Sequence, residues 1–220
     1  MPHTAYKRRS HRDGASAKQG HEVAHFELTR HNTHIKAQKF GQQQRRQRLQ
    51  PGQSIFSADL WRARALEIAP QFDEFGLAWL EEPIRHDDYA GAARLARELK
   101  VPVQIGENFS LPTAMSNALE QRASDYVMPD LERIGGVTGW RQAAEVAQSH
   151  GVKMSSHLFP EVSAHLLAAT PTCHYLEYVD WANVLLEEPL TIVDGHAVVP
   201  SRPGNGMVWD KTAVGRYRMR

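Results

Sequence analysis

Acidic and imidazole side chains recur at nearly even intervals along the second half of this chain, each at the end of a short apolar run. Successive members of the series lie 20–27 residues apart: Glu81, Glu107, Asp130, His157 and Glu177. A strand, a crossover helix and their connections occupy about that many residues. The spacing therefore predicts repeated strand–helix units, each of which delivers one polar group to a common point.

The segments between these polar residues carry the expected helix and strand signals. Helices are predicted over residues 60–75, 87–99, 138–150 and 163–170 and after Pro112, and strands over 77–80, 101–106, 126–128, 152–155 and 175–178. This alternation predicts an α/β fold with a mostly parallel sheet. Polar groups at the carboxyl ends of the strands favour a partial (β/α) TIM-type barrel, whose sites are built there. An open doubly wound sheet is the rival, but the chain has no G-x-G-x-x-G motif.

The first 64 residues differ sharply in charge from the rest. They hold 13 Lys and Arg against 4 Asp and Glu, whereas the remaining residues hold 13 against 21. Residues 1–53 also lack sustained apolar periodicity, as in segments that bury too little surface to order themselves. We therefore predict two parts: a basic, low-order or non-native leader over residues 1–62, and a partial barrel over residues 63–220.

Cysteine count, apolar runs and basic runs limit the cellular compartments and the kinds of partner that are expected for this chain. Cys173 is the single cysteine, so no internal disulfide can form, which favours a reducing compartment such as the cytoplasm. No apolar run approaches the roughly 18 residues of a membrane span, so no membrane is expected as a partner. Aromatic residues do not interleave the basic runs of the leader, so nucleic acid is not expected either. A homo-oligomer remains open.

Glu81 and Glu107 follow neighbouring predicted strands. Two carboxylates that converge on one point offer hard oxygen ligands, which suit Mg²⁺ or Mn²⁺ better than zinc. A lone strand-end glutamate would more often be a helix cap or a surface acid. Two in matching positions, followed by three more polar strand ends, favour a site.

Asp130 and His157 end consecutive predicted strands, so their side chains are expected to meet. A carboxylate beside an imidazole fixes its tautomer and raises its basicity, which makes a general base. Such a base can remove a weakly acidic proton if a metal stabilises the resulting enolate. Glu177 would then be a protonated acid that donates a hydrogen bond to the developing oxyanion, provided that burial raises its pKa.

These residues stand in motifs that resemble the C-terminal barrel domain of the enolase superfamily, and specifically its mandelate racemase subgroup. The resemblance covers roughly Ala65 to Tyr217. It is carried by Trp79–Pro83, Gly106–Asn108, Met128–Asp130, Ile134–Trp140, Ser155–Phe159, and Ser163–Thr172 followed by Leu176–Glu177.

The resemblance implies Mg²⁺ bound by Glu81 and Glu107 with Glu82 beside them, an Asp130–His157 dyad as the base on one face of the substrate, and Glu177 as the electrophilic acid. It implies a small carboxylate substrate, either a 2-hydroxy acid or a sugar acid, that passes through a metal-stabilised enediolate. Reprotonation would make the protein a racemase. Loss of a β-hydroxyl group would make it a sugar-acid dehydratase.

Two motifs of that family have no counterpart here. The stretch Ser54–Ser57 stands where a first metal ligand in an Asp-x-Asn motif is expected, and Ala24–Phe26 where a second base in a Lys-x-Lys motif is expected. We therefore expect impaired activity, or an inactive fragment or binding remnant. A frameshift or truncation upstream of Ala65 would explain this, and it predicts that the upstream DNA encodes both motifs in another frame.

Overall fold

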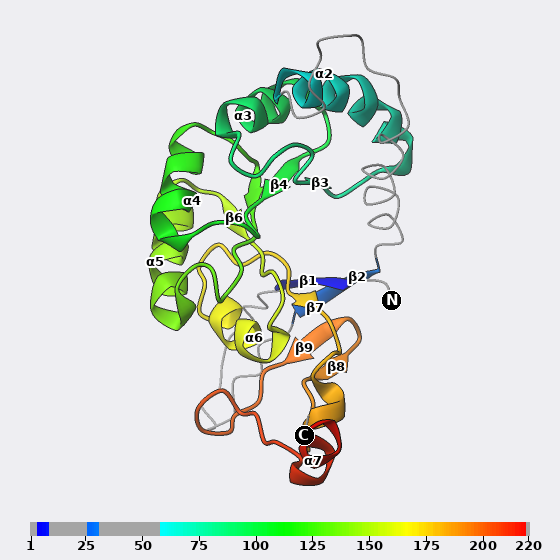
Figure 1. Ribbon diagram of the computed structural model, residues 1–220, viewed down its shortest axis with the longest axis vertical. Helices are drawn as coiled ribbons and strands as arrows, with labels where there is room; N and C mark the ends of the chain where they lie inside the picture. Colours follow the sequence, from blue (N-terminus) through cyan, green and yellow to red (C-terminus); the bar gives the residue numbers. More distant parts are fainter. Residues whose placement is uncertain (1–3, 9–25, 31–57, 219–220) are drawn as a thin grey trace, which may run out of the picture.

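The computed structural model describes residues 4–8, 26–30 and 58–218 (Figure 1), and for the first two segments it describes the backbone. The chain from residue 58 begins with α2 (Ala58–Ile68) and the 3₁₀ helix η2 (Ala69–Phe75). Gly76, with φ of 55°, ends this helical stretch, as the sequence predicts.

A four-stranded parallel sheet forms the centre of the fold, in the order β3-β4-β5-β6. Its strands are β3 (Leu80–Glu81), β4 (Val103–Ile105), β5 (Tyr126–Val127) and β6 (Lys153–Met154). They alternate with α3 (Tyr89–Glu98), α4 (Leu111–Glu120), α5 (Gly136–Ser149) and α6 (Pro160–Ala168). Helices α2 to α5 follow an arc outside the strands (Figure 1). The predicted α/β fold with a parallel, partial barrel is confirmed.

The core lies between these helices and the sheet. Val103, Val127, Leu95 and Met115 are fully buried there. Trp140 on α5 is also buried, and its indole N–H donates to the hydroxyl of Thr170 at 3.1 Å, so its polar atom is satisfied. The buried apolar side chains of α3, α4 and α5 thus pack inward.

The chain after α6 differs from the prediction of one further parallel strand over residues 175–178. Residues 172–175 do run beside β6, because Met154 bonds Thr172 and His174, and Ser156 bonds Tyr175, through the backbone. However, β7 (Glu177–Tyr178) leaves that sheet and pairs antiparallel with β1 (Thr4–Arg8). The backbone groups of Glu177 and Tyr178 find a partner strand in the N-terminal segment instead.

Strand β1 also pairs antiparallel with β2 (Phe26–Arg30). Both strands fall in the region for which we expected no regular structure, so the leader contributes a two-stranded ribbon to the fold. The rest of residues 1–57 lies outside the described part of the chain. The helix α2 begins at Ala58, two residues before the helix predicted from residue 60.

The C-terminal part contains η3 (Asn183–Leu185), the hairpin β8 (Thr191–Val193) and β9 (His196–Val198), and α7 (Lys211–Tyr217). In Figure 1 it lies at the opposite end of the molecule from α2. Within the described ranges, no helix has the length and apolar character needed to cross a bilayer.

Candidate active site

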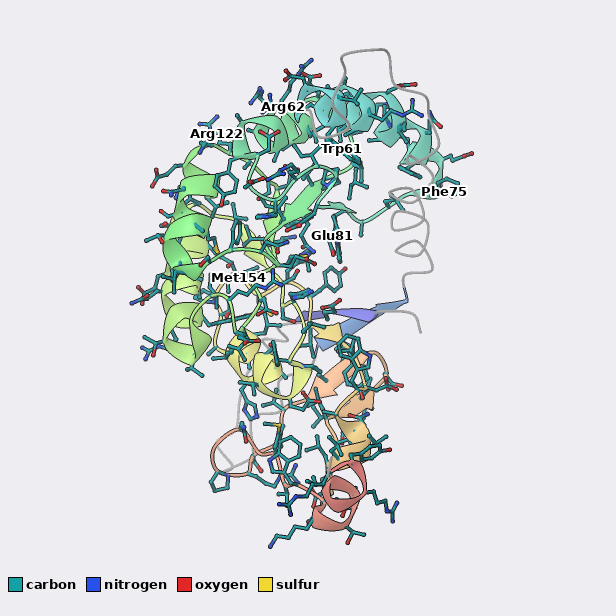
Figure 2. The ribbon with its side chains drawn as sticks, viewed as in Figure 1. Trp61, Arg62, Phe75, Glu81, Arg122 and Met154 are labelled. Carbon is teal, nitrogen blue, oxygen red and sulfur yellow. The ribbon has the colours of Figure 1, made fainter. Side chains whose placement is uncertain are left out.

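The carboxyl ends of the parallel strands bring the predicted polar residues to one edge of the sheet. Glu81 is the last residue of β3, and Glu107 follows β4 closely. Asp130 and His157 follow β5 and β6 and are joined by a parallel bridge. Figure 2 shows Glu81 on the side of the strands that faces away from α3 and α4.

Asp130 and His157 make the contact expected from their places at neighbouring strand ends. Nδ1 of His157 lies 2.9 Å from Oδ2 of Asp130. The other oxygen of Asp130 accepts hydrogen bonds from the backbone N–H groups of Glu132 and Arg133 at 2.8 and 3.0 Å. A carboxylate held in this way accepts the Nδ1 proton and leaves the lone pair on Nε2. The arrangement is therefore suited to a general base.

The Nε2 atom of His157 faces Oε2 of Glu107 at 3.4 Å. The His157 side chain is only 16% exposed, so this contact is largely shielded from water. The candidate base and one candidate metal ligand thus share one small space. A substrate proton removed by Nε2 would come from a carbon atom close to the carboxylates.

Glu81 lies in an electrostatically unfavourable place for a carboxylate. Burial raises the pKa of Glu81 to about 7, and the negative charges of Glu177 and Glu107 act in the same direction. A hydrogen bond from the indole of Trp79 at 3.4 Å opposes this rise. Carboxylates that repel one another in a shielded site are the donor set that a divalent cation stabilises.

Glu177 reaches the same group of carboxylates from β7, the strand that leaves the parallel sheet. Its Oε2 accepts a hydrogen bond from the backbone N–H of Leu158 at 2.8 Å, and its own N–H donates to Ser156 Oγ at 3.0 Å. Leu158 and Phe159 both have positive φ, 51° and 47°, a conformation that costs energy for residues other than glycine. The loop after β6 is thus held in a strained shape that directs an N–H at Glu177.

Sequence reasoning gave no role to Asn108 and Arg133, and placed Glu82 only beside the metal. The Glu82 carboxylate accepts from the Gly106 N–H at 3.2 Å and from Asn108 Nδ2 at 3.0 Å. Asn108 Nδ2 also lies 3.1 Å from Oε1 of Glu107, and Arg133 donates to Asn108 Oδ1. Apart from the contact between the neighbouring residues Asn108 and Glu107, no sequence pattern marks these contacts, because the partners lie on different strand–helix units.

The family resemblance implies three metal-binding carboxylates: Glu81, Glu107 and the aspartate of an Asp-x-Asn motif. The structure brings the first two together. No group of three His, Cys, Asp or Glu side chains suited to a metal is found among the described residues. Ser54–Ser57 and Ala24–His25 lie outside those residues. Asp59, the acid nearest to the expected position, is 89% exposed on α2 and pairs with Arg62, so it is not part of the site. Glu81 and Glu107 nevertheless fit Mg²⁺ as hard oxygen donors.

Several known proteins are similar to this chain in sequence and in fold. An "enolase" from an alphaproteobacterium, solved with bound magnesium, is 47% identical with a TM-score of 0.68, and the match covers 70% of this chain and 43% of that one. A Bradyrhizobium "enolase" complexed with magnesium and mandelic acid is 38% identical with a TM-score of 0.69, covering 72% and 44%. L-talarate/galactarate dehydratase of Salmonella typhimurium is 34% identical over 152 residues, covering 69% and 38%.

Other relatives include cycloisomerases, further sugar-acid dehydratases and a racemase. The chain spans about two fifths of the length of the relatives compared above. Residues 46–213 match the enolase C-terminal domain-like family, so the match begins upstream of Ala65, where the resemblance inferred from the sequence begins. The chain therefore belongs to the enolase C-terminal domain-like family.

Proposed function

We propose that this protein abstracts the α-proton of a 2-hydroxy carboxylate in a Mg²⁺-dependent reaction, as a mandelate racemase-like enzyme. The observation that carries the proposal is the Asp130–His157 contact of 2.9 Å, with Nε2 facing the carboxylate cluster. Asp130 holds the imidazole by Nδ1, so that Nε2 accepts the proton from the substrate carbon. His157 is thus the base and Asp130 its positioning partner.

The remaining site residues act on the charge that forms when the proton leaves. Glu177 is the acid that we assign to the developing oxyanion, because it lies close to Glu81 in the same group of carboxylates and, when protonated, would donate a hydrogen bond to that charge. Glu81 and Glu107 would hold Mg²⁺, which when bound supplies a positive charge beside the substrate carboxylate. Their repulsion supports this assignment, because a cation would offset it.

The similar proteins favour a second candidate function, which begins with the same abstraction of an α-proton. L-talarate/galactarate dehydratase is 34% identical to this chain, so a sugar acid that loses its β-hydroxyl group after proton abstraction is the alternative substrate. Proton exchange and dehydration need one base, whereas racemisation needs a base on each face. His157 is the base described here, so we expect exchange or dehydration rather than racemisation. A catalytically inactive binding remnant is the remaining alternative.

Solvent deuterium uptake separates these possibilities. The full chain is incubated in D₂O with Mg²⁺ and either mandelate or galactarate, and α-proton loss and water elimination are followed by ¹H NMR. We expect metal-dependent uptake or elimination that His157→Asn lowers by about 10²-fold or more, because the base is lost. Asp130→Asn is expected to lower it similarly, because the imidazole loses its tautomer.

His165→Asn is the matched control, since His165 lies on α6 and bonds the Asn205 carbonyl outside the site. It should leave the rate unchanged. If the wild-type chain shows neither uptake nor elimination in the presence of Mg²⁺, the enzymatic proposal is wrong and the binding remnant is favoured.

A further inference from the structure

Asn108 stands at the junction of two strand ends. Its side-chain amide nitrogen donates to Glu82 at 3.0 Å and to Glu107 at 3.1 Å. An amide has two N–H groups, so both bonds can form at the same time. Asn108 therefore links the carboxylate of Glu82, just after β3, to the carboxylate of Glu107, just after β4.

Glu82 is held from a second side. Its other oxygen accepts from the N–H of Gly106 at 3.2 Å. Gly106 has φ of 141°, and a Cβ there would lie 2.9 Å from the backbone nitrogen of Met128, so only glycine allows this approach. Glu82 itself has φ of 37°, an unusual value for glutamate. The carboxylate of Glu82 is thus occupied in joining the β3 end to the β4 end.

Arg133 extends the same chain of contacts to a third strand end. Its guanidinium donates to Oδ1 of Asn108, and its backbone N–H donates to Asp130 at 3.0 Å. Its carbonyl accepts from the N–H of Leu111 at the start of α4. Arg133 therefore contacts both the loop that carries Glu107 and the aspartate that holds His157.

We propose that Glu82, Asn108 and Arg133 form a brace that fixes the spacing between the metal-ligand pair Glu81–Glu107 and the Asp130–His157 dyad. The proposal rests on the proposed function, because it takes those four residues as the site. The brace residues are positioning residues. Glu82 is assigned here to the brace rather than to the metal, because both of its oxygens already accept hydrogen bonds from the β4–α4 loop.

Arg133 could affect Mg²⁺ binding either through its charge or by holding Asn108, and the two effects have opposite signs. A guanidinium near a cation site repels the cation, so its removal should tighten Mg²⁺ binding if Arg133 acts only through space. If Arg133 acts by holding Asn108, its removal should weaken Mg²⁺ binding, because the carboxylates lose their spacing. The sign of the change therefore separates positioning from electrostatics.

The test measures Mg²⁺ affinity of the full chain by isothermal titration calorimetry without substrate. Loss of an outer partner of a metal ligand costs about 10–100-fold in affinity. We expect Asn108→Leu to weaken Mg²⁺ binding about tenfold. Arg133→Met should weaken it about threefold, because the exposed Arg133 side chain holds Asn108 less firmly. In the double variant Arg133→Met should add nothing further, because it acts through Asn108.

Arg141→Met on the exposed face of α5 is the control for the lost charge and should leave the affinity unchanged. Amide hydrogen exchange of the metal-free protein gives a second readout that needs no metal. Gly106 and Leu111 should exchange faster in Asn108→Leu and Arg133→Met, while amides of α5 should not change.

The outcomes are distinguishable. Unchanged or tighter Mg²⁺ binding in Arg133→Met, or additive effects in the double variant, would overturn the brace while leaving the proposed function in place. If wild-type protein binds no Mg²⁺, the proposed function fails, and the brace is then judged by exchange at Gly106 and Leu111 alone. Unchanged exchange at both amides would remove it.

Discussion

Glu81 shows most clearly how the site departs from an ordinary surface of charged residues. Burial together with the charges of Glu177 and Glu107 raises its pKa from the ordinary 4.5 to about 7. The folded chain therefore keeps a proton on Glu81 at pH values where the unfolded chain has lost it. The stabilisation from this group is fully present below pH 4.5 and is lost as pH rises through about 7.

We expect the metal-free protein to lose on the order of 2–3 kcal/mol of unfolding free energy from this group between pH 4.5 and pH 7.5. Urea unfolding in EDTA at several pH values measures it. Glu81→Gln, which cannot ionise, should show a flatter pH dependence than wild type. Glu98→Gln is the control, because Glu98 forms an exposed ion pair with Arg94. Equal slopes for wild type and Glu81→Gln would contradict the assigned pKa.

At this scale the sequence predicted the residues that stand at strand ends and missed those that connect them. Glu81, Glu107, Asp130 and His157 were predictable because parallel strands place their carboxyl ends at one edge. The links through Asn108 and the Leu158 N–H were not, since they depend on backbone angles and on contacts 19–26 residues apart.

At the scale of elements, helix α3 shows a start that the sequence encodes directly. Asp88 precedes α3, and its Oδ1 accepts from the N–H of Gly91 at 3.0 Å. The same carboxylate receives two hydrogen bonds from the guanidinium of Arg62 on α2, with Nε lying 2.6 Å from Oδ2. Asp88 therefore caps α3 and ties it to α2. The Arg62 guanidinium accordingly lowers the pKa of Asp88.

We expect Asp88→Ala to lower the unfolding free energy by about 2 kcal/mol, with the cap and the ion pair each contributing roughly half. Because the pKa of Asp88 is lowered, this contribution is present at neutral pH and is lost as pH falls below its ordinary value. Asp87→Ala is the matched control, because Asp87 pairs with Arg85 on the exposed surface. Equal losses in the two variants at pH 7 would show that the cap and the Arg62 pair together contribute no more than an exposed ion pair.

Strand β7 shows why the strand predicted over residues 175–178 is only partly correct. Apolar residues end at Leu176, and the alternation of strands and helices placed a further parallel strand there. Residues 172–175 follow that prediction. The change of partner at Glu177 depends on β1, which lies more than 160 residues earlier in a segment without a periodic pattern. Local sequence does not indicate a pairing of that kind.

At the scale of the whole molecule, the buried core is concentrated in the part of the chain that follows residue 58. Among the described side chains, the main core runs from Ala65 to Ala197, within the predicted partial barrel. Among the described residues before α2, β1 pairs with β7 at Thr4–Tyr178 and Ala5–Glu177, and both β1 and β2 lie beside β9. We propose that the barrel part folds alone and that β1 mainly supports the strand that carries Glu177.

Removal of residues 1–57 tests this division. We expect cooperative urea unfolding to persist with about 1 kcal/mol less free energy, because the described contacts that are lost are two cross-strand pairs with β7 and the approach of β1 and β2 to β9. The amides of Glu177 and Tyr178 should exchange faster, while those of β4 and β5 stay protected. Ala5→Pro in the full chain removes the same pairing without shortening the protein, and it should reproduce both effects. Loss of the cooperative transition in the shortened chain but not in Ala5→Pro would mean that the leader is an integral part of the fold, because its contribution would then extend well beyond the pairing of β1 with β7.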